Sequence, residues 1–138
     1  KQKLKLKQKR KRTPYQIQKD KTWKACSEYN RRKDADWRGY VACCTCSIVK
    51  HYKELQAGHF IPGRHNAILF EDRGIHAQCY SCNFMKAGNP RKYDAFMRRR
   101  YGQSIIDELD ALDDTEIKYT IEDLSRIEKE YKDKIKLL

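Results

Sequence analysis

The sequence has no long hydrophobic run and no apolar segment behind its basic N-terminus. No stretch of its 138 residues approaches the roughly 18 apolar residues that span a bilayer. Leu4 and Leu6 stand alone among lysines, so a signal-peptide core is also missing. These absences argue against a membrane or secreted protein. We therefore expect a cytoplasmic protein, whose thiols stay reduced and whose six cysteines indicate metal binding before disulfides.

Acidic residues are absent from the first twelve positions, which carry eight basic side chains. The last 36 residues, in contrast, contain eleven acids and six bases. The net charge of +12 therefore leaves +9 on residues 13–102. Such a surface attracts polyanions, so nucleic acid is the leading partner, and solubility alone is the alternative. The arm is expected to contact DNA phosphates through Lys9, Arg10, Lys11 and Arg12.

The length fits one domain with extensions, and we predict an α+β fold. Residues 1–12 should form a disordered basic arm, residues 13–102 the main domain and residues 103–138 a helical extension. Helices are predicted from Asp20, from Pro90 after an Asn89 cap, from a Ser104 cap, and after a Thr120 and Asp123 capping box. Strands are predicted in three short segments, at residues 57–61, 68–70 and 75–78. The apolar stripe of the last helix packs either on its own domain or on a partner.

Two C-x-x-C pairs, separated by 32 residues, predict a structural zinc site. Cys43 with Cys46 and Cys79 with Cys82 can supply four thiolates at about 2.3 Å from one ion. Cys44 leaves an alternative pairing with Cys46 open, but the first choice matches the spacing of the second pair. Four sulfur ligands close the zinc shell, so catalysis must come from other residues.

Three residues between and after these pairs are candidates for chemistry. His59 lies in Gly-His-Phe-Ile-Pro on a strand-like segment, and can be a catalytic base, a metal ligand or a half-buried ring. His76 precedes the second cysteine pair, and Asn83 follows it directly. An amide oxygen with water molecules suits a hard ion such as Mg²⁺.

The order of these motifs resembles a known family. C-x-x-C, His-Phe-Ile-Pro and C-x-x-C-Asn are similar to the zinc-stapled HNH endonucleases, which have a ββα-metal core. The closer resemblance is to the phage NinG/Rap family of recombination endonucleases. Its motifs are found at residues 27–36, 56–64, 69–83 and 88–93. The resemblance covers roughly residues 22–102.

The resemblance implies a fold, an activity and roles for individual residues. The expected fold is a zinc-stapled ββα-metal core with helices on either side. His59 would be the general base that activates water, and Asn83 a ligand of a catalytic Mg²⁺ or Mn²⁺ ion, with His76 as the second-choice ligand. The substrate would be branched DNA such as a Holliday junction or a D-loop. A phage protein would work in the cytoplasm or nucleoid of its host.

Two glycines depart from the family pattern. Most HNH enzymes have Asp or His directly before the base, where this chain has Gly58, and a usual asparagine is replaced by Gly74. A related group of ββα-metal nucleases also has glycine before the base and relies on one asparagine and water. That likeness makes Asn83 the leading metal ligand.

Basic residues complete the predicted site. Arg64 can bind a phosphate through two hydrogen bonds or can be a surface arginine. Four further basic side chains can contact the DNA backbone or can simply be solvated. These four are Lys86, Lys92, Arg98 and Arg99.

Three functions are compatible with these features. The first is a metal-dependent DNA endonuclease, and the second is a zinc-containing module that binds DNA without cutting it. The third is a nuclease-like protein whose last helix recruits a phage recombinase or a second copy in a homodimer.

Overall fold

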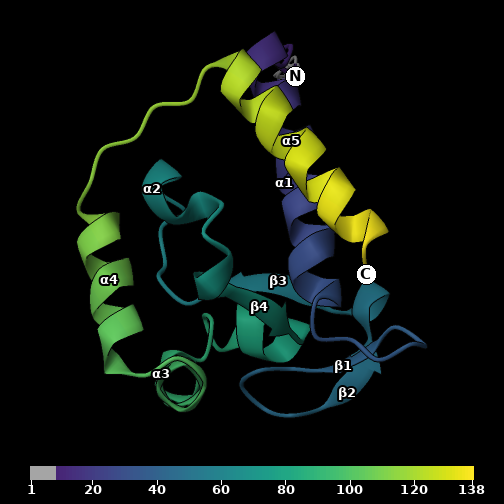
Figure 1. Cartoon of the computed structure of the whole chain (residues 1–138), viewed down its shortest axis with the longest axis vertical. Helices are drawn as coiled ribbons and strands as arrows, with labels where there is room; N and C mark the ends of the chain where they lie inside the picture. The colour runs from purple at the N-terminus through teal and green to yellow at the C-terminus, as the bar shows by residue number, and fades with distance from the viewer. Residues whose placement is uncertain (1–8) are drawn as a thin grey trace, which may run out of the picture.

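The computed structural model describes residues 9–138 and has an α+β architecture (Figure 1). Helices and two small antiparallel sheets alternate along the chain. In chain order the elements are α1 (Pro14–Arg32), β1 (Tyr40–Ala42), β2 (Val49–His51), η1 (Tyr52–Glu54), β3 (Gln56–His59), α2 (Asn66–Leu69), η2 (Asp72–Gly74), β4 (Ile75–Gln78), η3 (Ser81–Met85), α3 (Pro90–Arg100), α4 (Gln103–Asp113) and α5 (Ile121–Lys136). Residues 1–8 of the predicted basic arm lie outside the described residues.

Helix α1 begins six residues before the predicted start at Asp20. Thr13 caps it, because its hydroxyl accepts a hydrogen bond from the Gln16 backbone N–H at 3.2 Å. The Gln16 side chain in turn accepts from the Thr13 N–H at 3.0 Å. Pro14 occupies the first helical position, where its missing N–H costs nothing. The predicted start was therefore wrong, since it overlooked this capping box.

The strands β3 and β4 form the hairpin that carries His59. They are antiparallel, with Gly58 opposite His76 and His59 opposite Ile75. This confirms both predicted strands. The strand predicted at residues 68–70 is wrong, because Ile68 and Leu69 belong to the buried helical turn α2. A short apolar run does not by itself distinguish a strand from a buried helical segment.

The three C-terminal helices lie where they are predicted, with corrections at two caps. Asn89 precedes α3 but its side chain makes no capping hydrogen bond, and its amide lies 3.6 Å from the Cys82 sulfur instead. Helix α4 begins at Gln103, so Ser104 lies inside it and does not cap it. The Thr120 and Asp123 capping box at the start of α5 is confirmed.

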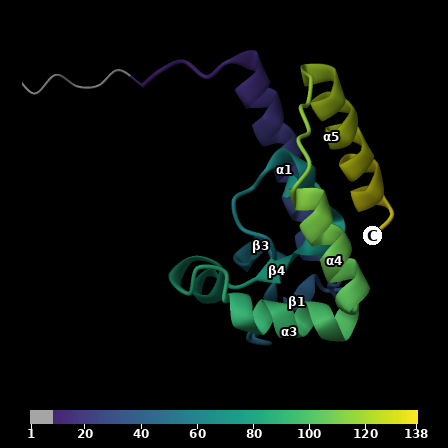
Figure 2. The same cartoon turned by 90° about the vertical axis from the view of Figure 1, so that its left-hand side faces the viewer.

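Helix α5 lies beside α1 in both views (Figures 1 and 2). The Thr22 hydroxyl donates to the Leu124 carbonyl at 2.8 Å, and the rings of Tyr29 and Tyr131 are 5.7 Å apart. The step from Thr22 to Tyr29 in α1 is as long as the step from Leu124 to Tyr131 in α5, and it runs in the same direction along the chain. The two helices are therefore parallel. Leu124 and Tyr131 are buried. The apolar stripe of α5 therefore packs on its own domain.

Candidate metal centre and catalytic hollow

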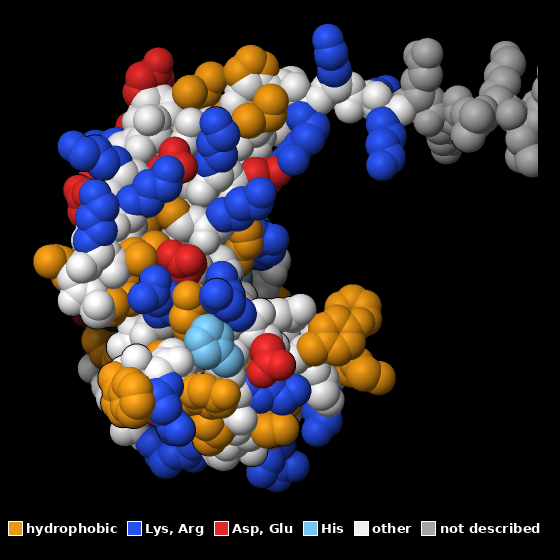
Figure 3. Space-filling model, turned by 90° about the vertical axis from the view of Figure 1, so that its right-hand side faces the viewer, with side chains coloured by type: hydrophobic (Ala, Val, Ile, Leu, Met, Phe, Trp, Pro, Cys, Tyr) orange, Lys and Arg blue, Asp and Glu red, His pale blue; other side chains and the backbone are white. Residues whose placement is uncertain are grey.

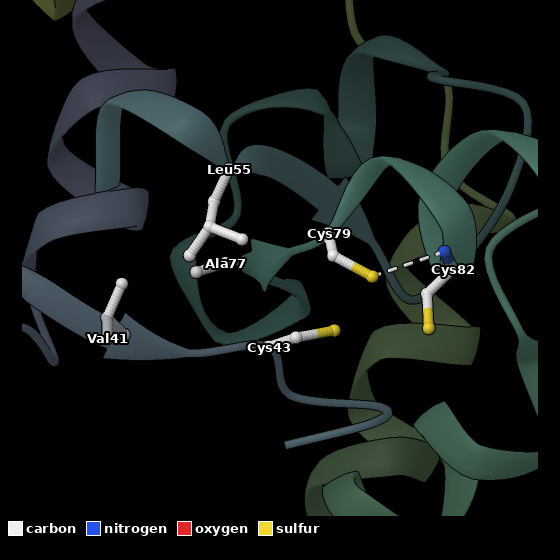
Figure 4. Close-up of a cluster of buried hydrophobic side chains, with 6 residues drawn as sticks. All are labelled: Val41, Cys43, Leu55, Ala77, Cys79 and Cys82. Atoms are coloured by element: carbon white, nitrogen blue, oxygen red, sulfur yellow. Dashed lines mark hydrogen bonds between the residues drawn. The ribbon is translucent and has the colours of Figure 1, made fainter. Parts of the chain in front are cut away.

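The four cysteines of the two C-x-x-C pairs form one cluster of sulfur atoms. The sulfurs of Cys43, Cys46, Cys79 and Cys82 all lie within 4.8 Å of one another, and those of Cys46 and Cys79 are 3.7 Å apart. A tetrahedral zinc ion with bonds of about 2.3 Å needs sulfurs about 3.8 Å apart, so the cluster fits zinc. In Figure 4 the labelled cysteines lie next to apolar side chains such as Leu55 and Ala77.

Hydrogen bonds favour the thiolate form of Cys43. Burial acts to raise the pKa of Cys43, but hydrogen bonds from the Thr45 hydroxyl and from backbone N–H groups outweigh it and lower that pKa. The Thr45 oxygen is 3.3 Å from the Cys43 sulfur. The Cys82 N–H likewise lies 3.4 Å from the Cys79 sulfur. Donors of this kind stabilise a thiolate at Cys43. At Cys46 a hydrogen bond from the Ile48 N–H lowers the pKa, but burial and the neighbouring cysteine sulfurs outweigh it and raise that pKa to about 12.

The other two cysteines lie outside the cluster. Cys44 is half-buried beside Tyr93 and Met97, and burial raises the pKa of its thiol. The structure thus confirms Cys43, and not Cys44, as the partner of Cys46. Cys26 is fully buried in α1, and burial raises its pKa to about 12. It is a core thiol with no accessible chemistry.

A separate surface hollow of about 240 Å³ brings together three predicted catalytic residues. His59 comes from the end of β3, Arg64 from the following loop and Asn83 from η3. The full lining consists of Trp23, Ala57, His59, Pro62, Arg64, Asn83, Ala87 and Gly88. Their roles stay predictions, but their meeting in one place is a property of the fold.

The ring of His59 is held in one orientation. Its Nε2 lies 3.1 Å from the Leu69 carbonyl oxygen, which can only accept a hydrogen bond, so Nε2 carries the proton. The lone pair of a neutral ring is then on Nδ1. Burial lowers the pKa of His59, and the charge of Arg64 lowers it further against the raising effect of the Leu69 contact. The ring is therefore neutral at pH 7 and able to accept a proton at Nδ1.

Trp23 is a site residue that the sequence did not reveal. Its ring stacks on His59 with 5.1 Å between centroids and 20° between planes. The Arg64 guanidinium lies 4.5 Å from the Trp23 ring centroid. Arg64 also has a left-handed backbone, with φ of 52°, which is uncommon outside glycine. The sequence showed Trp23 only as an apolar residue of a helix, and only folding brings α1 to the hollow.

Asn83 presents one oxygen and no nearby carboxylate supports it. Its Nδ2 donates to the Gln56 Oε1 at 2.6 Å, which leaves Oδ1 as the free end of the amide. None of the eight lining residues is acidic. Glu71 instead pairs with Arg73 at 2.7 Å, and Asp72 accepts from Tyr131 and Lys134. Among the eight lining residues, Asn83 is the one whose side chain offers an oxygen to a hard cation.

The structure explains why position 58 has no side chain. A Cβ added to Gly58 would overlap Oε1 of Gln78, which is fully buried. The Gln78 amide is held in place because its Nε2 donates to the Thr45 hydroxyl at 3.1 Å and to the Gly88 carbonyl at 2.8 Å. Gln78 therefore fills the space of a side chain at 58 and connects the first cysteine pair to the lining of the hollow.

His76 does not line the hollow that contains His59. It lies opposite Gly58, one position out of phase with His59, so it points to the other face of the hairpin. Its Nδ1 is 3.1 Å from the Tyr93 hydroxyl and its Nε2 is 2.8 Å from the Tyr101 hydroxyl. Burial, aided by the charges of Lys33 and Arg100, lowers the pKa of His76 to about 3. Both ring nitrogens are used inside the protein, so the structure does not place His76 as a ligand in the hollow.

The predicted DNA-binding residues fall into separate groups. Lys86, Lys92 and Arg99 line one groove of about 440 Å³ beside the first cysteine pair. Arg98 instead pairs with Asp94 at 2.7 Å. The four residues of the arm are exposed at the start of α1, where Arg12 pairs with Asp20. The face in Figure 3 carries many more Lys and Arg side chains than acids.

These features define an α+β protein with a four-cysteine cluster that can bind zinc. Among residues 9–138, no helix combines the length and apolarity needed to cross a membrane.

Comparison with known proteins identifies the family. The family model described as "Bacteriophage Lambda NinG protein" matches residues 1–138, so the chain belongs to the NinG family. It is 31% identical over 113 residues to "Protein ninG" of Escherichia phage lambda, covering 81% of this chain and 52% of the relative. The corresponding protein of Salmonella phage P22 is 30% identical, with 81% and 53% covered. The chain thus spans about half the length of these relatives. No solved structure matches it.

Proposed function

We propose that the chain is a metal-dependent DNA endonuclease of the HNH type that cuts branched recombination intermediates, such as Holliday junctions and D-loops. One observation carries the proposal, namely the hollow shared by His59, Asn83 and Arg64. A neutral imidazole can act as the base, an amide oxygen can hold a divalent ion, and a guanidinium can stabilise the phosphate charge in phosphodiester hydrolysis. The choice of branched DNA follows from the resemblance to the NinG/Rap recombination endonucleases.

The first step assigned to the chain is proton removal from water. With Nε2 donating to the Leu69 carbonyl, Nδ1 of His59 accepts the proton as the water oxygen attacks phosphorus. The bond from phosphorus to the departing sugar oxygen breaks in the same displacement. Trp23 holds the imidazole plane throughout, because its ring stacks on His59.

Arg64 and Asn83 act on the phosphate. The Arg64 guanidinium can bind the non-bridging oxygens and stabilise their charge. A bound Mg²⁺ or Mn²⁺ ion would neutralise charge on the scissile phosphate and on the departing oxygen. Asn83 Oδ1 would be its protein ligand, since Nδ2 is already committed to Gln56.

A nicking assay on a four-way junction tests the proposal. With Mg²⁺ or Mn²⁺, His59→Ala should lower the rate by about 100- to 10,000-fold, the usual contribution of a general base. Asn83→Ala should also abolish cutting, whereas junction binding without added divalent ion should stay near wild type. His65→Ala is the matched control, because His65 lies next to Arg64 in sequence but does not line the hollow.

The competing function is a zinc-containing module that binds DNA without cutting it. A wild-type protein that binds junctions but nicks none with any divalent ion would establish that alternative. Cutting that survives in His59→Ala would instead show that the base lies elsewhere.

A further inference from the structure

An apolar projection stands next to the hollow, and neither the fold nor the proposed chemistry uses it. Tyr80, Phe84 and Met85 are 52%, 68% and 73% exposed. The rings of Tyr80 and Phe84 stack on each other with 5.2 Å between centroids and 18° between planes. We call these three side chains the aromatic knob. Figure 3 shows hydrophobic side chains projecting from one edge of the molecule, and Figure 2 places the turn with η3 at that edge.

The knob is fixed relative to Asn83. Phe84 follows Asn83 directly, and both belong to the π-helical turn η3, where the Lys86 N–H donates to the Ser81 carbonyl at 2.9 Å. The Cys79 and Cys82 pair lies at the start of this turn and anchors it to the four-cysteine cluster. Consecutive Cα atoms are about 3.8 Å apart. A phosphate bound in the hollow that Asn83 lines would therefore have its own base or a neighbouring base within reach of the knob.

The charge around the knob favours DNA as its partner. Residues 74–93 contain no acid and carry three exposed basic side chains, Lys86, Arg91 and Lys92, of which Lys86 directly follows Met85. Residues 9–13 leave α1 toward the same side of the molecule as η3 (Figure 2). An apolar protein surface would complement the knob but not these exposed cations. A polyanion with exposed aromatic faces complements both.

We infer that the aromatic knob stacks on unpaired or unstacked bases and thereby makes the protein selective for branched DNA. In a continuous duplex, insertion must first separate two stacked base pairs, which costs a few kcal/mol. At a branch point the stack is already interrupted, so the same contact forms without that cost. The inference rests on the proposed function and adds residues for its structure selectivity.

Paired binding measurements test the inference. A four-way junction with 2-aminopurine at the branch is compared with a continuous duplex of the same sequence, without added divalent ion. Binding of the wild type should quench the fluorescent base by stacking. The double variant with Tyr80→Ala and Phe84→Ala should lose the quenching and bind the junction about 5- to 100-fold more weakly, the range expected for one base stack, with duplex affinity nearly unchanged.

Three controls separate stacking from other effects. Trp37→Ala removes a 93% exposed aromatic side chain from a different segment and should leave both affinities unchanged. Lys86→Ala should weaken both substrates equally, because a phosphate contact does not distinguish them. Met85→Ala leaves the stacked rings of Tyr80 and Phe84 in place, so it should keep the quenching and weaken junction binding less than the double variant does.

The inference is overturned if the double variant weakens both substrates alike or keeps the branch quenching. It is also overturned if light scattering shows a wild-type dimer that the double variant makes monomeric while the preference for junctions persists. In that case the knob contacts a second copy of the chain. Failure of the proposed function has a different signature, since the wild type would then nick neither substrate with any divalent ion.

Discussion

The contact between Gly58 and Gln78 predicts that the effect of a methyl group added at position 58 depends on the side chain at position 78. Replacing glycine by alanine at an unstrained position usually stabilises a protein by about 0.4–1 kcal/mol through the unfolded state. At position 58 the new Cβ would overlap Gln78 Oε1. We therefore expect Gly58→Ala to destabilise the wild type.

The magnitude follows from what Gln78 must give up. Its side chain is fully buried, and moving it breaks hydrogen bonds to Thr45 and Gly88 that contribute about 0.5–1.5 kcal/mol each. Overpacking of a filled site typically costs about 1–3 kcal/mol. Gly58→Ala should thus lower the free energy of unfolding by about 2–3 kcal/mol.

The same substitution should be nearly neutral once Gln78 is shortened. In a Gln78→Ala background the amide is gone and only its Cβ, 3.1 Å from the added methyl group, remains close. A shift of a few tenths of an ångström accommodates that contact. The coupling free energy in a double-mutant cycle should therefore be about 2 kcal/mol, well above the values found for independent sites.

Urea unfolding followed by circular dichroism, with zinc present throughout, gives the four free energies of the cycle. Gly74→Ala is the matched control, because a Cβ there meets only Leu109 at an ordinary 3.8 Å. That variant should be as stable as the wild type or slightly more so. The reasoning is refuted if the two changes add within about 0.5 kcal/mol, or if Gly58→Ala is as harmless as Gly74→Ala.

Three further predictions concern titration and metal. Arg64 lowers the pKa of His59, so Arg64→Gln should raise it and move the acid limb of the nicking rate to higher pH; an unmoved limb would contradict this. Cys79→Ser should reduce bound zinc, measured by a colorimetric chelator, whereas Cys44→Ser should keep it at one ion per chain. The pKa of His76 is about 3 in the folded protein and ordinarily 6.5. Below pH 6.5 the unfolded chain therefore binds a proton that the folded protein does not, and the protein becomes less stable as the pH is lowered. In His76→Gln this proton uptake is lost. The slope of the unfolding free energy against pH between 6.5 and 5.5 should therefore be smaller than in the wild type, by up to about 1.4 kcal/mol per pH unit.

Local signals in the sequence predicted the parts of the fold that depend on neighbouring residues. The two-residue gap within each cysteine pair sets the reach of its thiolates, and the four sulfurs do meet. The capping box of Thr120 and Asp123 likewise needs only three residues of separation. The gap within a cysteine pair and the capping box each act over a few residues, whereas bringing the two pairs together depends on the fold.

Contacts between distant segments could not be read from the sequence. Trp23 precedes His59 by 36 positions, and only the packing of α1 on the β3–β4 hairpin brings their rings together. The direction of His76 depends on strand register, because a shift of one residue exchanges the two faces of the hairpin. The register pairs His76 with Gly58 and sends it toward Tyr93 and Tyr101.

The packing of Gln78 bears directly on how the proposed site can hold a cation. Gln78 fills the space beside Gly58, and its amide joins Thr45, beside the cysteine cluster, to Gly88, in the lining of the hollow. A side chain at position 58 would have to displace this connection. The four-cysteine cluster then fixes the hollow from two directions, through Gln78 on one side and through Cys82 and Asn83 on the other. Under the proposed function, Asn83 would be the ligand of a bound ion, because among the eight lining residues it is the one with a side-chain oxygen.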